Sequence, residues 1–195
     1  MRSTQPPEGT SIPPVPLDAA PAGSTIPSHY RWCVACGTDH PSGLHLRMAT
    51  GEGLRVHGRF TVGSHHQGSP GLAHGGVLAT AMDEALGYLN WRVGTPAVTA
   101  RLEVDYRAPV PVGTELVLEA EVIGVRGRKV YCRGSGRVGS PDGLIAIEAR
   151  ALFVQVPISH FLQAGNPDIV QEAIDDRAKG APSWLAAGET IELSP

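Results

Sequence analysis

The chain alternates apolar and polar residues most regularly between positions 97 and 106. Val98, Leu102 and Val104 would lie on one face of a strand there, and Thr99 and Glu103 on the other. Further β-like runs are found at residues 44–49, 54–62, 115–124, 129–138 and 144–156. Turns rich in glycine or proline join the last four strands, so the pattern predicts an antiparallel sheet.

A period of three to four residues replaces this alternation between positions 75 and 93. The apolar members of this stretch are Leu78, Met82, Ala85, Leu86 and Leu89. They form one stripe of a helix, and a lone long helix has to bury such a stripe against the sheet. The predicted fold is therefore α+β: an antiparallel sheet of five or six strands curled around one central helix.

The two ends of the chain have a different composition. Residues 1–28 hold seven prolines and almost no large apolar side chains. We expect them to form a mobile tail, since little apolar surface is available to offset the entropy of ordering. The domain is then predicted at residues 29–157. Residues 158–195 form an extension with a short helix that starts near Asn166 and Pro167.

Overall composition narrows the class of protein. A length of 195 residues suits one domain, and a net charge of −3 argues against nucleic-acid partners. No apolar run of 18 residues could span a membrane, and the N-terminus lacks the pattern of a secretory signal. Three cysteines do not form a disulfide framework. We expect a cytoplasmic protein with no membrane partner.

The predicted helix carries a second stripe of small and polar residues: Gly76, Thr80, Asp83, Gly87 and Asn90. Small residues allow another backbone or a ligand to approach closely. A carboxylate on such a face suits catalysis, although it could equally be a solvated helix charge.

The loop before this helix, residues 65–76, is rich in glycine and proline and ends in Gly75 and Gly76. Their backbone N–H groups would lie free at the positive end of the helix dipole. This arrangement suits an anion or a carbonyl that develops negative charge. The alternative is a loop that simply requires glycine flexibility.

Residues 74–85 resemble the signature of hotdog-fold acyl-CoA thioesterases, in the branch that includes the phenylacetate-pathway enzymes. His74-Gly75-Gly76 opens the helix, and Asp83 follows nine positions after the histidine, which is the spacing of that family. The similarity covers about residues 30–157. It implies hydrolysis of an acyl-CoA thioester without a metal or bound cofactor.

The resemblance also assigns roles to residues of the helix. The N–H of Gly75, together with that of Gly76, would polarise the thioester carbonyl. Asp83 would act as general base for water or as a nucleophile that forms an anhydride. Both roles remain open at this point.

Other positions match the family's pattern less closely. Thr99 would orient the water from a second subunit. Gln67, offset by one residue, matches an amide side chain before the turn, and His66 is the neighbouring alternative. His74 would shape the loop or transfer a proton. Glu84 would replace Asp83 as the carboxylate if the register were different.

Relatives of this kind place each active site between two subunits, which predicts a homodimer or a dimer of dimers. Two other functions on the same fold remain as alternatives. A dehydratase or hydratase would need an Asp/His pair, and the helix contains no histidine. A non-catalytic acyl-CoA-binding module would not require Asp83.

Cys33 and Cys36 form a Cys-x-x-Cys pair near the start of the domain. A redox pair normally opens a helix, whereas glycine and proline follow this one. A zinc site with His40 and His45 has acceptable spacing but only one cysteine pair. We expect a packed pair without metal.

Overall fold

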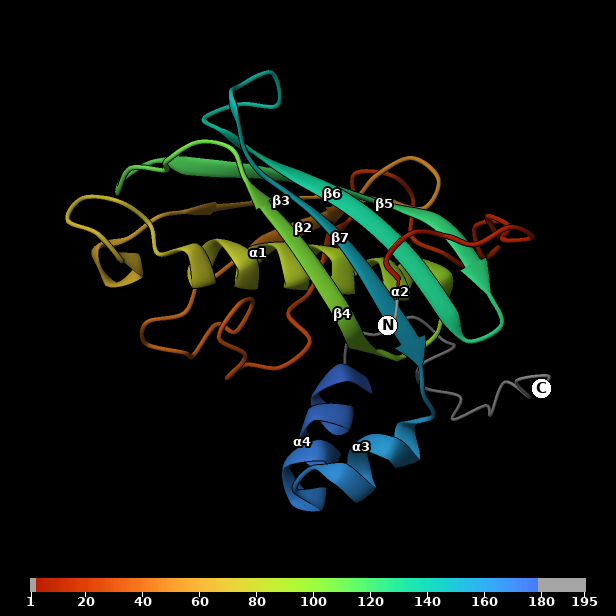
Figure 1. Ribbon diagram of the computed structural model, residues 1–195. Helices are drawn as coiled ribbons and strands as arrows, with labels where there is room; N and C mark the ends of the chain where they lie inside the picture. Colours follow the sequence, from red (N-terminus) through yellow and green to blue (C-terminus); the bar gives the residue numbers. More distant parts are fainter. Residues whose placement is uncertain (1–2, 179–195) are drawn as a thin grey trace.

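The computed structural model describes residues 3–178 and shows an antiparallel sheet wrapped around a central helix, α1 (Figure 1). Its helices are α1 (Gly75–Gly87), α2 (Leu89–Val93), α3 (Ile158–Ala164) and α4 (Pro167–Ala178), with a short 3₁₀ turn at Ser64–His66. Its strands are β1 (Thr25–Ile26), β2 (Arg47–Thr50), β3 (Arg55–Thr61), β4 (Ala97–Tyr106), β5 (Glu115–Arg126), β6 (Lys129–Val138) and β7 (Ile145–Gln155).

The sheet has the strand order β1-β2-β3-β5-β6-β7-β4. The predicted antiparallel arrangement is confirmed, but β4 pairs with β7 rather than with β5, and the sheet has seven strands rather than five or six. The additional strand, β1, comes from the proline-rich segment and pairs with Met48 and Ala49 of β2. A two-residue strand gives no periodic signal, so alternation alone could not reveal it.

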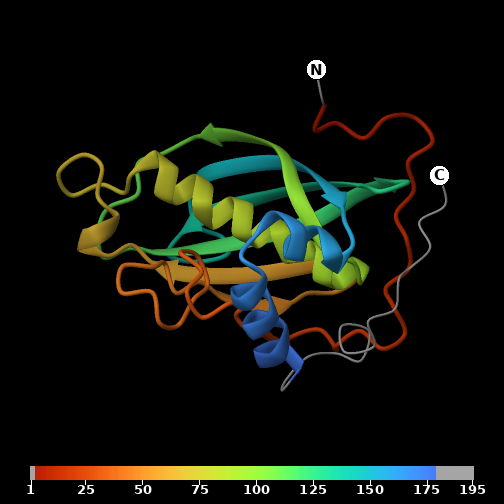
Figure 2. The same ribbon diagram turned by 90° about the horizontal axis from the view of Figure 1, so that it is seen from below.

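Helix α1 lies along the concave face of the sheet (Figure 2). Leu78, Met82 and Leu86 of the predicted stripe are at most 4% exposed. The helical stretch was expected to be continuous to residue 93, but it divides at Tyr88 into α1 and α2. It ends at Gly94, which adopts a left-handed conformation with φ of 83°.

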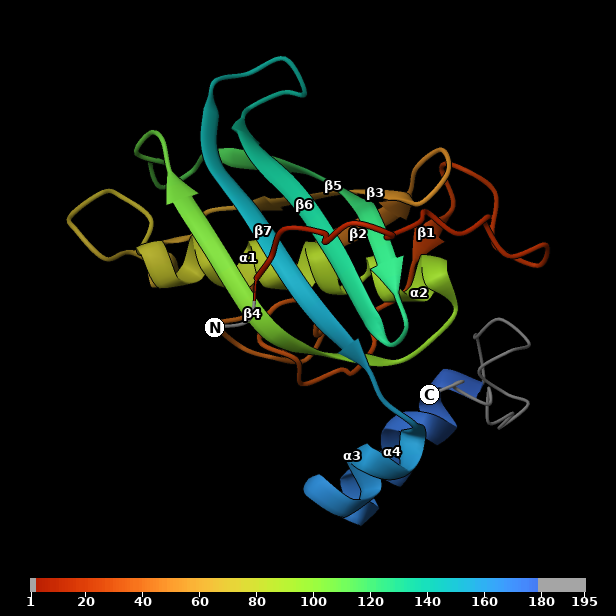
Figure 3. The same cartoon turned by 45° about the vertical axis from the view of Figure 1, so that its right-hand side comes forward.

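The N-terminal segment crosses the outer face of the sheet (Figure 3). Ser11 and Val125 exchange two backbone hydrogen bonds, at 3.2 and 2.7 Å. Thr4 is buried and hydrogen-bonds the Glu103 side chain on β4. These contacts are polar and join residues far apart in the sequence, which explains why a search for apolar surface suggested a mobile tail instead.

Arg92 of α2 connects this segment to the domain. Its side chain is buried and donates to the carbonyl of Ala20 at 2.7 Å and to that of Gly53 at 2.8 Å. The guanidinium therefore holds the N-terminal segment and the β2–β3 turn against the end of the central helix.

A β-bulge in β4 changes which face its side chains occupy. Thr99 pairs with Phe153 and Arg101 pairs with Leu152, so Ala100 is an extra residue without a partner. The predicted alternation placed Thr99 on the face opposite the helix, and this was wrong. One extra residue reverses the alternation, so Thr99 faces α1.

Helices α3 and α4 form a hairpin after β7. The predicted helix start is confirmed, because Asn166 Oδ1 accepts the N–H of Asp168 at 3.0 Å and α4 begins at Pro167. The expected helix reached Lys179, which lies outside the described residues. None of the helices within residues 3–178 is long and apolar enough to cross a membrane.

Candidate active site

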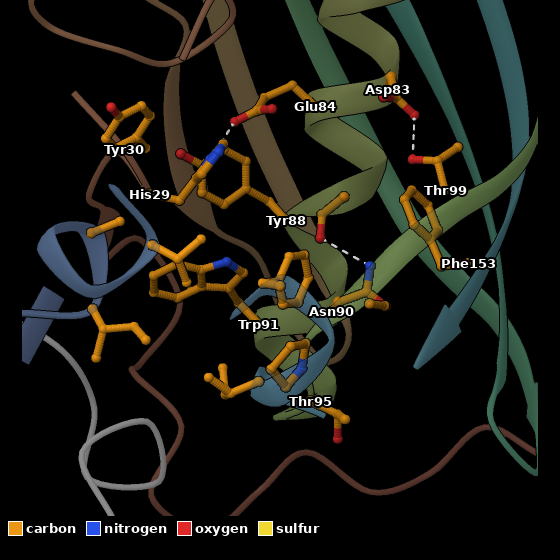
Figure 4. Close-up of a pocket in the computed structure, with 18 of the residues that line it drawn as sticks. His29, Tyr30, Asp83, Glu84, Tyr88, Asn90, Trp91, Thr95, Thr99 and Phe153 are labelled. Atoms are coloured by element: carbon orange, nitrogen blue, oxygen red, sulfur yellow. Dashed lines mark hydrogen bonds and ion pairs between the residues drawn. The ribbon is translucent and has the colours of Figure 1, made fainter. Parts of the chain in front are cut away.

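A cavity of about 440 Å³ lies between α1, the start of β4 and the α3–α4 hairpin (Figure 4). Polar groups from Asp83, Asn90 and Thr99 line one part of it. Trp91 and Phe153 begin the apolar part, which the hairpin continues. A cavity of this size with few polar groups suits a small-molecule ligand.

Asp83 is the carboxylate at the polar part of this cavity. It is half-buried and accepts a hydrogen bond from Thr99 Oγ1 at 3.0 Å. Burial raises the pKa of Asp83, and the Thr99 hydroxyl partly opposes that rise. The structure thus brings two predicted residues together. Both belong to one chain, whereas Thr99 was expected to reach Asp83 from a second subunit.

Glu84 points to the other side of α1 (Figure 4). Its Oε1 lies 3.1 Å from Nδ1 of His29, a residue that no sequence pattern singled out. Burial raises the pKa of Glu84, and the hydrogen bond from His29 opposes this. Adjacent helix positions are about 100° apart, so Glu84 and Asp83 have separate partners.

Asn90 closes the polar part of the cavity one turn beyond Gly87. Its Nδ2 donates to the Gly87 carbonyl at 3.0 Å. Its Oδ1 is buried and has no hydrogen-bond partner within residues 3–178. A buried acceptor without a hydrogen-bond partner is energetically costly. Its place on the small and polar stripe was the only signal in the sequence.

The two glycines at the start of α1 differ in what their N–H groups do. The Gly76 N–H donates to Nδ1 of His74 at 2.8 Å, so His74 caps the helix. Gly76 was expected to help polarise a carbonyl, but its donor is already used. The Gly75 N–H donates to no group in the described part of the chain. Gly75 is thus the available donor.

The residues predicted before this turn serve the loop instead. Gln67 donates to the Ser64 carbonyl at 2.9 Å and accepts from the Gly71 N–H at 2.7 Å. His66 is buried, and its Nδ1 accepts the N–H of Gly63 at 2.9 Å. Neither side chain lines the cavity. Both residues were predicted near a substrate because the sequence does not show which side chains form hydrogen bonds within the loop itself.

Gly75 also lies away from Asp83. Eight residues separate them, which is roughly 12 Å along a helix axis. Gly75 does not line the cavity that contains Asp83 and Thr99. A single chain therefore presents a carboxylate with its hydroxyl in one place and a free N–H donor in another.

The α3–α4 hairpin supplies apolar lining that the sequence did not predict. Its contributing side chains are Ile158, Phe161, Ile169, Val170, Ala173 and Ile174. The extension was expected to carry no chemistry of its own, and the structure instead makes it a wall of the cavity.

Comparison with known proteins shows which family part of this chain resembles. Residues 70–142, which contain α1, β4, β5 and β6, match the model of the thioesterase superfamily. The match assigns this segment, residues 70–142, to the thioesterase superfamily. The chain's antiparallel sheet around one helix is the hotdog fold, as the resemblance at residues 74–85 predicted.

Two kinds of curated relative are similar to this thioesterase-superfamily domain. Acyl-coenzyme A thioesterase THEM4 of Xenopus laevis is 34% identical over 97 residues, covering 50% of this chain and 43% of that protein. MIOREX complex component 3 of Saccharomyces cerevisiae is 35% identical over 85 residues, covering 40% of this chain and 31% of that protein. The chain thus spans less than half the length of these relatives.

Solved structures give the same fold. A protein described as a thioesterase superfamily member is 31% identical, with a TM-score of 0.59 over 64% of this chain and 63% of that one. The Escherichia coli PaaI protein from the phenylacetic acid degradation operon is 18% identical, with a TM-score of 0.54 over 58% and 80% of the two chains. At that identity the likeness shows the fold alone.

Proposed function

We propose that this thioesterase-superfamily domain hydrolyses acyl-CoA thioesters to a free acid and CoA. The observation that carries the proposal is the Asp83–Thr99 pair, which lies at the polar part of a largely apolar cavity. The name of the Xenopus laevis relative, an acyl-coenzyme A thioesterase, supports the same reaction.

The chemistry follows from the position of Asp83. A water held between its carboxylate and Thr99 would lose a proton to Asp83 as its oxygen bonds to the thioester carbon. The C–S bond then breaks, and the proton passes to the departing thiolate of CoA. A positioned base of this kind contributes about 10²–10⁴-fold to the rate. Direct attack by Asp83 would give an anhydride, which water then opens.

The carbonyl oxygen needs a donor close to Asp83, and Gly75 of the same chain is roughly 12 Å away along the helix. We therefore propose a homodimer in which the Gly75 N–H of one protomer faces Asp83 and Thr99 of its partner. Strand β4 is at the edge of the sheet, so its outer backbone groups are available for pairing. It also carries Thr99, which places the reacting residues beside that edge.

The apolar lining indicates the substrate class. An acyl chain would extend from Asp83 past Phe153 toward Ile174, burying its methylenes at roughly 0.8 kcal/mol each. We propose a substrate with an extended apolar acyl group.

Release of free thiol from a panel of acyl-CoAs tests the reaction. Asp83→Asn removes the base and keeps the shape, and we expect kcat to fall at least about a hundredfold. Asp105→Asn, an exposed carboxylate on β4, is the matched control and keeps wild-type turnover. Equal turnover by wild type and Asp83→Asn would overturn the role of Asp83. Binding of acyl-CoA without turnover would support a binding module, and loss of enoyl absorbance would support a hydratase.

A further inference from the structure

The Cys33–Cys36 pair lies in a tight turn that brings both sulfur atoms to one side. The Gly37 N–H donates to the Cys33 carbonyl at 2.8 Å, and the Ala35 N–H donates to Cys33 Sγ at 3.4 Å. A Cβ atom at Gly37 would lie 2.4 Å from the Arg31 carbonyl oxygen and 2.5 Å from that of Cys33. Only glycine fits this turn.

Two further side chains face the sulfur atoms from outside the turn. His29 Nδ1 lies 3.1 Å from Cys36 Sγ and 3.1 Å from Glu84 Oε1. Glu84 Oε2 lies 3.9 Å from Cys33 Sγ. Each of these four residues offers one possible metal-ligand atom, and these four atoms lie within 4.8 Å of one another.

We propose that His29, Cys33, Cys36 and Glu84 bind one zinc ion. Zinc prefers four tetrahedral ligands drawn from thiolate, imidazole and carboxylate groups, and bond lengths of about 2.0–2.3 Å place such ligand atoms roughly 3.3–3.8 Å apart. The three contacts at 3.1, 3.1 and 3.9 Å lie near this spacing, and all four ligand atoms lie within 4.8 Å of one another. Two thiolates also favour zinc over magnesium or calcium, which select oxygen ligands.

Outer hydrogen bonds support the two sulfur ligands. Ser28 Oγ lies 3.3 Å from Cys36 Sγ, and the Ala35 N–H donates to Cys33 Sγ. A donor such as the Ala35 N–H favours the thiolate form and orients a metal ligand.

The ligand set differs from the one that the sequence offered. His40 and His45 had acceptable spacing, but neither belongs to the cluster. His45 Nδ1 contacts the Gly37 carbonyl at 2.8 Å, and His40 Nδ1 accepts the Ser42 N–H. Glu84 comes from α1, more than 45 positions after Cys36, so only the fold brings it to the cysteines.

Four protein ligands leave no open position, so the ion would be structural rather than catalytic. It would fasten the segment around residues 29–36 to α1 through Glu84, the residue after Asp83. His29 and Tyr30 line the cavity, so the ion would also fix one of its walls.

Metal content of the full chain tests the site. We expect about one zinc per chain from elemental analysis and native mass spectrometry, and a cobalt-loaded protein with thiolate-to-metal absorption. Cys33→Ser, Cys36→Ser and Glu84→Gln should each reduce zinc content at least tenfold. Cys132→Ser on β6 and His40→Gln are the matched controls and should keep the zinc. Circular dichroism identifies any variant that fails to fold.

Asp83→Asn separates this proposal from the proposed activity, because it should lose hydrolysis and keep its zinc. Zinc below about a tenth of an equivalent after growth and refolding with added zinc would overturn the site. So would equal zinc content in Cys33→Ser and wild type. A Cys33–Cys36 disulfide that forms under air in place of metal, with no cobalt absorption after reduction, would also overturn it and indicate a redox pair.

Discussion

Thr99 donates a 3.0 Å hydrogen bond to Asp83 because an extra residue, Ala100, turns the threonine toward the central helix. A regular strand would have pointed this hydroxyl away from the carboxylate. Bulges often re-aim a side chain beside an active site. We propose that Thr99 positions both the carboxylate and an attacking water.

The Thr99→Val variant tests this positioning. It keeps the β-branched shape and removes the hydroxyl, and a hydrogen bond to a charged group contributes about 1.5–3 kcal/mol. We expect kcat to fall roughly 10–100-fold in the thiol-release assay, with a small change in KM. Thr99→Ser should recover most of the rate, and Thr61→Val on β3 should have no effect. Wild-type kcat for Thr99→Val would contradict the role.

Gly75→Pro tests the carbonyl donor without breaking the helix. Proline suits the first helical position, and the extended His74, with φ of −69° and ψ of 137°, allows it. The variant loses the N–H, so kcat should fall about 10²–10³-fold. Gly75→Ala keeps the N–H and should retain most activity.

Mixing two inactive variants tests whether the site spans two subunits. In a mixed dimer of Gly75→Pro and Asp83→Asn, one of the two sites would hold an intact Gly75 and an intact Asp83. Random exchange from an equal mixture should therefore restore about a quarter of wild-type activity. No recovery despite mixed dimers in native mass spectrometry would place both residues of each site in one chain.

The α3–α4 hairpin predicts how specificity can be changed. Ala173 lines the apolar part of the cavity, and Ala173→Trp would fill space that a long acyl chain needs. In wild type, kcat/KM should rise up to roughly fourfold per methylene until the cavity is full. The variant should reach its maximum at a shorter chain and leave the rate for acetyl-CoA unchanged. An unchanged profile would show that the hairpin does not contact the acyl group.

The hydrogen bonds of Arg92, which lie outside the candidate active site, are expected to stabilise the folded protein. Arg92→Met leaves the carbonyls of Ala20 and Gly53 without their donor, at a cost of roughly 1.5–3 kcal/mol. Urea denaturation should show this loss in the free energy of unfolding. Arg126→Met is the control, since that side chain donates to one exposed carbonyl, of Glu8, and should change stability by about 0.5 kcal/mol or less.

Glu121 predicts a pH dependence of stability. Burial raises the pKa of Glu121, but hydrogen bonds and charges from Arg133 and Arg55 outweigh it and hold the pKa below the usual value of 4.5. The folded state therefore favours the ionised form of Glu121. This contribution to stability is present above the pKa of the unfolded group and is lost as the pH falls through the lower pKa of the folded group.

Urea denaturation at pH 7 and near pH 4 measures this contribution. Glu121→Gln should be less stable than wild type at pH 7, by about 1 kcal/mol or less for a largely exposed network. The difference should shrink at the lower pH. A difference that grows on acidification would contradict the assignment.

Much of the fold was encoded in local patterns. Leu78, Met82 and Leu86 predicted one buried helix face, and the tight turns between strands predicted an antiparallel sheet. The spacing of nine positions between His74 and Asp83 indicated the family. Such a spacing can be read from the sequence because neighbouring residues alone decide where a helix begins and which residues lie in its middle. The proposed cytoplasmic location and the domain limits at residues 29 and 157 stay predictions.

Tertiary structure decided the rest. The bulge at Ala100 depends on pairing with β7, so alternation along the strand could not show where Thr99 points. Glu84 meets His29, Cys33 and Cys36 because the sheet and helix bring distant segments together. The sequence alone determined the helix, its carboxylate and its free N–H group. Which side chains contact them depended on long-range packing, and such contacts leave no periodic signal in the chain.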